Sequence, residues 1–595
     1  MEMQSTKFQE TSNNAKAPTI ENSDNFDIEK YIQIQLEQER MRLEKEAGIT
    51  SNNIQHFARP EENLFTSDQR EKTTLLFGGM TWRHEHLIEG VLRGLGYKCE
   101  AIPTPDVKAF QLGKEYGNNG QCNPTYFTVG NLIQFLQNLE EKGINREEII
   151  DRYILLTAGA CGPCRFGMYE AEYRLALRNS GFDGFRVILF QQSGGLDQSE
   201  MEAGLDMNLD FFLSVISAFN MGDMLNELGY QIRPFEVDRG KTDEVMNHTL
   251  EFMHDVMRDK RRFEINGIWK RLLSGSNLEG KVNYIGKFLD QLAGKDYIHA
   301  LNKIRDNFNE IEVDRFRVKP IVKITGEFWA QLTEGDGNFN MFRFLEGENS
   351  EVLVEPIGTW IMYLMAQYKQ KVQDRKGINK DDVEAQVWRL DKRLANELHY
   401  RKKIGTMTIA EKIFKREYTR LQEALGGTLH ELVDQYELQR LGHPFYNTRA
   451  AGGEGHLEVA KNIYYSNKNM AHMVLSLKPF GCMPSSQSDG AQVAVVEQFK
   501  DMIYLPIETS GEGEVNAHSR VQMALGSARV KAKEEFKSAL ARTGKSLEDM
   551  KVYVEDHPEL KRPMYKVPKT EGIVGTAANF ILHVSDLLDR KFATA

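Results

Sequence analysis

Residues 153–167 read YILLTAGACGPCRFG, an apolar run that ends in a turn carrying Cys161 and Cys164. The run does not alternate between apolar and polar residues, so it predicts a strand that is buried on both faces, as in parallel sheets. A helical pattern follows at 168–179, and a second apolar run, RVILFQQS, occupies residues 186–193. A strand, a helix and a strand in this order predict a βαβ unit.

Further strands of the same kind lie on both sides of this unit. Apolar runs separated by helical stretches are found at TTLLFGGM (73–80), CEAIPTP (99–105), KPIVKITGEFW (319–329), EVLVEPIG (351–358), MVLSLKPFGC (473–482) and MIYLPIETSG (502–511). Strands that alternate with helices are typical of α/β domains whose chemistry lies at the carboxyl ends of the strands. The sequence therefore predicts an α/β fold of two Rossmann-like parallel-sheet lobes that face each other across a cleft.

Helical segments separate and interrupt the two predicted lobes. Residues 240–315 have a helical pattern with no convincing strand, and a long, highly charged helical stretch begins at Ile361. The polar residues 1–25 predict disorder, and charged residues with apolar spacing predict a helix over 28–46. We expect an N-terminal disordered and helical extension (1–70), a first α/β lobe (71–240), a helical linker region (241–318), a second α/β lobe (319–540) with a charged helical insertion at about 361–440, and a C-terminal extension (541–595).

The composition narrows the class of protein. The 595 residues suffice for roughly four domains of ordinary size or two large ones with insertions. Hydrophobic residues make up 41% and charged residues 27%, which is enough apolar material for real cores. The 75 Lys and Arg against 86 Asp and Glu give a net charge of −11, which disfavours a nucleic-acid binder. We find neither a targeting peptide nor a stretch of ~18 apolar residues, so we expect a cytoplasmic protein without a membrane partner.

Four of the five cysteines share one kind of position. Cys161 and Cys164 follow the strand predicted at 153–159, while Cys122 in GQCNPT and Cys482 in PFGCMPS lie in Gly/Pro loops near expected strand ends. Open α/β sheets gather their ligands at these ends, so facing lobes bring the four thiolates together. Four thiolates suit a [4Fe–4S] cluster or a structural zinc ion. Cys99 opens a predicted strand, and we expect it to pack in the core.

No other catalytic template is complete. The chain contains neither a GxSxG nucleophile elbow nor a GxGxxG fingerprint, and GSNLEGKV (275–282) departs from a Walker A loop at Val282. The turn at 191–195 and Glu327 in TGEFW follow predicted strands and could line a cleft. Ordinary strand-to-helix turns explain them about as well, so the sequence assigns no catalytic residue.

Several of these segments resemble the 2-hydroxyacyl-CoA dehydratase and CoA-activase-related superfamily. KPIVKITGEFW, LKPFGCMPS, CGPCRFGMYEAEYR and GQCNPT look like the part of large activase-like proteins that follows the ATPase modules, and the resemblance covers roughly residues 72–525. It implies two α/β lobes with a cysteine-bound iron–sulfur cluster between them. It also implies electrons of very low potential, which an ATPase of the actin-like fold injects at the expense of ATP.

Departures from that superfamily limit what the resemblance implies. The chain has no DxGSTxxK-like phosphate loop, so any activase is a separate polypeptide. Relatives with a double cubane cluster use more cysteines than the five present here. Dehydratase subunits leave one iron open for substrate, whereas Cys122, Cys161, Cys164 and Cys482 can close a [4Fe–4S] site. We therefore expect a low-potential electron-transfer or reductase component, forming a homo-oligomer, that acts on a small or CoA-linked substrate or on another protein.

Two other functions remain open. A zinc-stapled scaffold also uses four thiolates, although structural zinc sites usually take their ligands in short-range pairs and Cys482 stands alone. The CGPC sequence is also typical of a thioredoxin-like dithiol couple, which opens a helix after a strand. Such a couple predicts a reversible disulfide between Cys161 and Cys164 and no stoichiometric metal, and it leaves Cys122 and Cys482 unexplained.

Overall fold

A computed structural model describes residues 28–46, 65–159, 164–191, 195–196, 204–264, 277–378, 390–450 and 453–594 of the chain. The chain divides into two compact units, residues 1–62 and residues 63–595. The smaller unit contains helix α1 (Ile28–Glu46), which confirms the helix predicted at these residues. The disorder predicted for residues 1–25 falls outside the described residues. In the described part of the chain, no helix has the length and apolar character needed to span a membrane.

The first lobe of the larger unit is built on a sheet with the strand order β2-β1-β3-β4-β5. The first four of these strands are parallel, and the short β5 joins β4 antiparallel. Its strands are β1 (Thr74–Phe77), β2 (Lys98–Ala101), β3 (Tyr153–Gly159), β4 (Arg186–Gln191) and β5 (Gly195–Leu196). The helices between them are α2 (Trp82–Gly94), α3 (Val107–Tyr116), α4 (Asn123–Glu141), α5 (Arg146–Arg152), the 3-10 helix η2 (Arg165–Met168) and α6 (Tyr169–Asn179). All four residues of β1 are buried, as an unalternating apolar run predicts.

A layer of helices connects the two lobes. It consists of α7 (Leu209–Ile232), α8 (Lys241–Arg258), α10 (Asn277–Ala293) and α11 (Asp296–Phe308). Buried residues of α7, α8 and α11 share one hydrophobic core with α2 and β1 of the first lobe, including Leu225, Leu250 and Ile304. Helices α8, α10 and α11 lie within residues 241–318, where the sequence predicts a helical linker, and α8 and α11 pack in the same core as the first lobe.

The second lobe has a sheet of four parallel strands in the order β7-β6-β8-β9. These strands are β6 (Ile321–Gly326), β7 (Glu351–Leu353), β8 (Met473–Pro479) and β9 (Tyr504–Thr509). Around them lie α12 (Phe328–Leu332), the 3-10 helix η3 (Gly335–Asn338), α13 (Met341–Gly347), α17 (Gln435–Gly442), α18 (Leu457–Asn467) and α19 (Met483–Gln498). The chain is thus an α/β protein with two Rossmann-like parallel-sheet lobes, as predicted.

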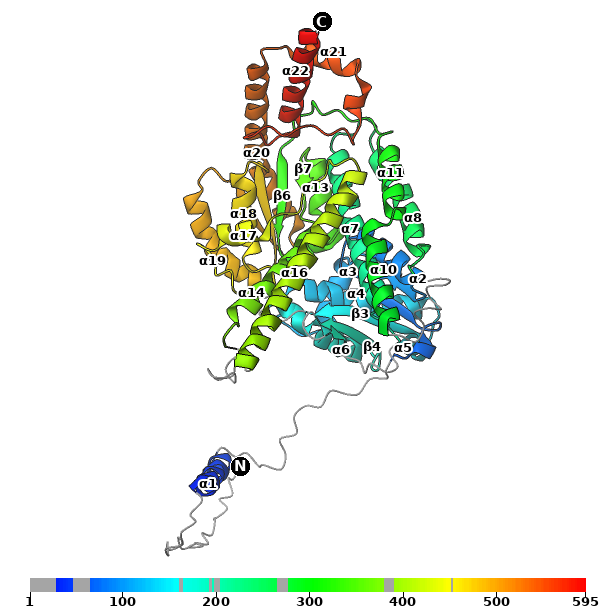
Figure 1. The fold of residues 1–595 in the computed structure, drawn as a ribbon, viewed down its shortest axis with the longest axis vertical. Coiled ribbons are helices and arrows are strands. Elements are labelled where there is room, and N and C mark those ends of the chain that lie inside the picture. The colour runs from blue at the N-terminus through cyan, green and yellow to red at the C-terminus, as the bar shows by residue number, and fades with distance from the viewer. Residues whose placement is uncertain are drawn as a thin grey trace, which may run out of the picture. The chain divides into compact units, whose positions relative to one another are not determined.

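The helical insertion lies between β7 and β8. It begins with α14 (Ile357–Asp374) and continues with the long α16 (Leu390–Ala424), which runs beside α14 (Figure 1). Pro356 is the N-cap of α14, so strand β7 ends before the apolar run predicted at 351–358 does. The strand predicted at 99–105 likewise ends at Ala101, because Pro103 and Pro105 cannot donate to a sheet ladder.

The C-terminal residues form a separate helical layer at one end of the second lobe (Figure 1). Its helices are α20 (Glu514–Thr543), α21 (Leu547–Glu555), the 3-10 helix η4 (Pro558–Lys561) and α22 (Thr576–Thr594). α20 packs on the second sheet through Val521 and Leu525 and reaches the C-terminal core at Ala539. This helix therefore crosses the boundary predicted between residues 540 and 541.

Acidic side chains tie the two lobes together at helix starts. Asp223 of α7 accepts hydrogen bonds from the backbone N–H groups of Ile357 and Gly358 at 2.7 and 2.8 Å. Glu334 and Asp336 follow α12 in the second lobe, and they accept from the first backbone N–H groups of α2 and α3 at 3.1 and 3.0 Å. These N–H groups have no partner inside their own helices, so each carboxylate satisfies a donor of the facing element. The contacts hold the carboxyl edges of both sheets against each other.

Candidate functional site

Cys122 and Cys482 lie on loops that the fold places side by side. Each is the N-cap of a helix with a proline in its first turn, α4 for Cys122 and α19 for Cys482. The backbone N–H of Asn123 donates to the carbonyl oxygen of Phe480 at 3.1 Å, which joins the two loops directly. The two lobes therefore contact each other at the residues next to these cysteines.

Glycine at position 481 permits this contact. Gly481 has a φ of +74°, and a Cβ atom there would lie 3.1 Å from the carbonyl oxygen of Gln121 and 3.3 Å from the Cα of Cys122. Residues with a side chain rarely adopt this backbone conformation, and they would also press on the facing loop. Gly481 therefore lets the loop of Cys482 lie directly against the backbone of the Cys122 loop.

Cys164 approaches the same place from the turn after β3. It is the N-cap of η2 and is half-buried. A Cβ atom built on Gly453 would lie 3.7 Å from the Cβ of Cys164 and only 2.6 Å from the Cγ of Pro484. Cys164 and Pro484, in the first turn of α19, therefore both lie close to Gly453. We call the loops that carry Cys122, Cys164 and Cys482 the cysteine site.

Cys161, the fourth predicted ligand, lies outside the described residues, as do Gly162 and Pro163. Within the described ranges, which omit Cys161, no three His, Cys, Asp or Glu side chains are grouped so that they could hold a metal ion. Cys122, Cys164 and Cys482 are all described, so these three side chains do not by themselves form a metal-binding group, and the set of four that includes Cys161 stays a prediction. Cys99 is buried in strand β2 and belongs to the core of the first lobe, which confirms its predicted packing role.

Two hydroxyl groups contact the sulfur of Cys122. Its Sγ lies 3.1 Å from the Oγ1 of Thr125 and 3.3 Å from the phenol oxygen of Tyr169. Burial and the neighbouring Cys122 raise the pKa of Tyr169 well above its usual value, so the phenol keeps its proton. When Cys122 is a thiolate, Tyr169 and Thr125 can therefore both donate hydrogen bonds to it. Donors of this kind stabilise a negatively charged sulfur ligand.

Two glutamates lie at the same site, Glu454 buried and Glu327 half-buried. The carboxylate of Glu327 accepts from the N–H groups of Trp329 and Ala330 at 3.1 and 2.9 Å, and Glu454 accepts from the N–H of Phe328 at 2.6 Å. The second carboxyl oxygen of Glu454, Oε2, is buried and has no hydrogen-bond partner among the described residues. Both glutamates thus converge on the first turn of α12.

Burial and crowding change the protonation of these groups. Burial raises the pKa of Glu327 to about 7, and burial together with the nearby Glu327 raises the pKa of Glu454 well above its usual range. Burial also raises the pKa of Cys164 to about 12 and that of Cys482 further, and the two glutamates add to both shifts. The neutral forms are favoured because burial disfavours the charged forms and because neighbouring negative charges would repel each other. The site can therefore hold protons on carboxyl groups beside its thiols.

Sequence reasoning found Glu327 but missed Glu454 and His456. His456 is buried beside the ring of Tyr363, neither of its ring nitrogens has a described hydrogen-bond partner, and burial lowers its pKa to about 4. Both missed residues come from the glycine-rich segment GGEGH (452–456) just before α18. Glycine clustering was the only sequence signal, since their neighbours come from α12 and α14.

The described cysteines carry the donor atom that an iron–sulfur cluster requires, since such clusters are bound by thiolate sulfur. Cys122 and Cys482 lie on loops of different lobes that contact each other, although the described side chains do not form a metal-binding group. Neither Cys122 nor Cys482 uses its sulfur to cap its own helix, so both sulfurs keep this capacity. A negative charge at the start of the long helices α4 and α19 is favoured by the helix dipole.

The chain matches no known protein family by family model, and no curated protein matches it. The resemblance to the dehydratase superfamily therefore rests on the motif segments quoted above.

Proposed function

We propose that this chain is an iron–sulfur protein related to the 2-hydroxyacyl-CoA dehydratases. One [4Fe–4S] cluster would be held by Cys122, Cys161, Cys164 and Cys482, and the protein would act as a low-potential electron-transfer or reductase component. The observation that carries the proposal is the hydrogen bond between the loops of Cys122 and Cys482, which joins cysteines from different lobes. A thioredoxin-like couple or a local zinc knuckle does not require that junction.

The side chains around the cysteines have defined roles in this proposal. The bound cluster supplies one-electron chemistry. Tyr169 and Thr125 donate hydrogen bonds to the Cys122 sulfur and so tune the reduction potential. Glu454 holds a proton on its carboxyl group and would deliver it to a small or CoA-linked substrate that is reduced beside the cysteines. A separate ATPase of the actin-like fold would donate the electron, because this chain lacks the phosphate loop for that task.

Iron and acid-labile sulfide measured on anaerobically purified protein test the proposal. Cys161→Ser and Cys482→Ser should lose most of the iron and the visible absorption of the cluster. Cys99→Ser is the matched control, because Cys99 is also buried but packs in the core of the first lobe. Equal iron loss in all three variants, or stoichiometric zinc in colourless wild-type protein, would contradict the proposal.

A further inference from the structure

A cavity of about 500 Å³ lies away from the cysteines, between the second lobe and helices α2, α7 and α8. This volume is within the range of roughly 300–1,000 Å³ that is typical of small-molecule sites. Three arginines and three carboxylates line the cavity, and so do aromatic rings, among them Trp82. We call this cavity the charged pocket. Its charged residues are Arg83, Arg233, Arg343, Asp243, Glu334 and Glu346.

One wall of the charged pocket is an alternating network of charges. Arg233 donates to Asp243 at 3.0 Å and to Glu346 at 2.6 Å, and Arg343 donates to Asp243 at 3.2 and 3.4 Å. The side chains of Arg233 and Glu346 are only 10% and 8% exposed, whereas the Arg343 side chain is 59% exposed. Its bonds to Asp243 are also the longest of the network. Arg343 is therefore the cation of this wall that an anionic group from solution can reach.

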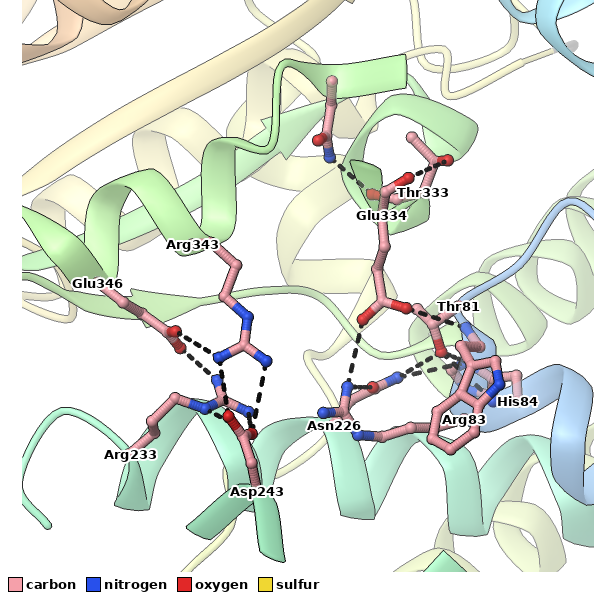
Figure 2. Close-up of polar contacts among 12 residues, drawn as sticks. Thr81, Arg83, His84, Asn226, Arg233, Asp243, Thr333, Glu334, Arg343 and Glu346 are labelled. Atoms are coloured by element: carbon pink, nitrogen blue, oxygen red, sulfur yellow. Dashed lines mark hydrogen bonds and ion pairs between the residues drawn. The ribbon is translucent and has the colours of Figure 1, made fainter. Parts of the chain in front are cut away.

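The opposite wall presents an accessible carboxylate (Figure 2). Glu334 accepts from the backbone N–H of Trp82 at 3.1 Å and from Arg83 at 3.3 Å, and its side chain is 30% exposed. Trp82, whose own N–H holds Glu334, is 43% exposed. One face of the Trp82 indole stacks on the ring of His86, with the ring centroids 5.4 Å apart, and the residue is still partly exposed to solvent. A carboxylate held by the backbone of an accessible tryptophan suits an ammonium group, because the aromatic ring attracts cations.

Two further features are typical of a binding site. Arg83 is only 7% exposed, and its Nε atom is buried without a hydrogen-bond partner among the described residues. Phe339 and Asn340, on the loop that lines the pocket, have φ values of +61° and +50°. Two successive non-glycine residues in the left-handed region are strained, and such strain is concentrated at functional sites.

We propose that the charged pocket binds a small zwitterion with an anionic group at one end and an ammonium group at the other. Arg343 receives the anionic end, and Glu334 with the indole of Trp82 receives the ammonium end. The equal numbers of arginines and carboxylates match a ligand without net charge, since a polyanion would meet three carboxylates. None of the cysteines lines the pocket, so this inference stands independently of the cluster.

Calorimetric titration of the full-length protein with matched probes tests the inference. The zwitterions are glycine, γ-aminobutyrate and 6-aminohexanoate, and the single-charge controls for γ-aminobutyrate are butyrate and butylamine. At least one zwitterion should bind saturably at one site per chain, and about tenfold more tightly than the anion and the amine of its own length. No saturable binding by any zwitterion, or equal binding of a single-charge analogue, would overturn the inference.

Two variants locate the site. Arg343→Gln should weaken binding of the zwitterion about tenfold, because a charge-assisted hydrogen bond is lost. Arg401→Gln is the control, since Arg401 is an exposed arginine paired with Glu397 on α16 and does not line the pocket. Both arginines are exposed, so neither change should prevent folding. Identical affinities in the two variants would show that the zwitterion does not use Arg343.

Discussion

The cysteine site and the charged pocket lie at the two ends of the short helix α12, yet the pKa shifts of Glu327 in the first and Asp243 in the second have opposite directions. Glu327 precedes α12 at the cysteine site, and Glu334 follows it in the charged pocket. At the cysteine site, burial raises the pKa of Glu327. In the charged pocket, burial also acts to raise the pKa of Asp243, but Arg233 and Arg343 outweigh it and the pKa is lowered. The protonated form of Glu327 is thus favoured in the first region and the ionised form of Asp243 in the second, where burial still raises the pKa of Glu346.

The largest effect is expected from disturbing the strand that leads into Glu327. Gly326 has a φ of +116°, and a Cβ atom on it would collide with the carbonyl oxygen of Leu477 in β8. Gly326→Ala should therefore lower the free energy of unfolding by about 3 kcal/mol or more in denaturant titrations. It should also reduce the iron content of the cysteine site.

Gly513→Ala is the control that measures the cost of backbone strain without a collision. Gly513 also has a positive φ, +89°, but open space surrounds its Cβ position. The control variant should lose only the smaller free energy that a left-handed alanine costs, about 1 kcal/mol. If the two variants lose equal stability, backbone strain alone explains the loss in Gly326→Ala, and the close packing of β6 against β8 before Glu327 contributes nothing to it.

The next effect is a pH dependence that differs in sign between the two regions. The pKa of Glu327 is raised from 4.5 to about 7, so the folded protein binds this proton more tightly than the unfolded chain. The stability it contributes is fully present below about pH 4.5 and is lost as the pH rises from there through about 7. Glu327→Gln should flatten the decline of unfolding free energy over this range.

Asp243→Asn provides the opposite case from the charged pocket. The pKa of Asp243 is lowered in the folded protein, so its contribution is present above its unfolded pKa and is lost as the pH falls. This variant should lose stability near neutral pH and keep the wild-type decline of unfolding free energy between about pH 4.5 and pH 7. A flattened decline over this range in Asp243→Asn, with none in Glu327→Gln, would reverse the comparison.

The smallest expected effect concerns the hydrogen bond from Tyr169 to Cys122. Tyr169→Phe removes one donor to a sulfur ligand, so the reduction potential of the cluster should become more negative by roughly 40–60 mV. Tyr173→Phe makes the same chemical change one turn further along α6, where Tyr173 packs in the core of the first lobe. Redox titration followed by electron paramagnetic resonance measures both. An equal shift in the two variants would exclude a specific role for Tyr169.

Local sequence patterns predicted the parallel-sheet framework. Strand β3 has the bounds expected from YILLTAG, because a strand buried on both faces shows as an unbroken apolar run. Helix α1 also has its expected bounds. Proline marks the ends of β2 and β7, and this local signal was available in the sequence although the predicted strands ran past it.

The surroundings of the site could not be predicted in the same way. Glu454 meets the start of α12, and Asn123 meets Phe480, through contacts between elements that are far apart in the chain. No periodicity encodes such contacts, because they depend on how two lobes dock. The charged pocket was missed for the same reason, since Arg233, Glu334 and Arg343 come from three different elements.

Anomalous diffraction from crystals of the anaerobically purified protein tests the central claim most directly. Data collected on both sides of the iron edge should show one compact group of iron atoms bound by the sulfurs of Cys122, Cys161, Cys164 and Cys482. A single zinc atom at these cysteines, or no anomalous scatterer between the loops of Cys122 and Cys482, would contradict the account.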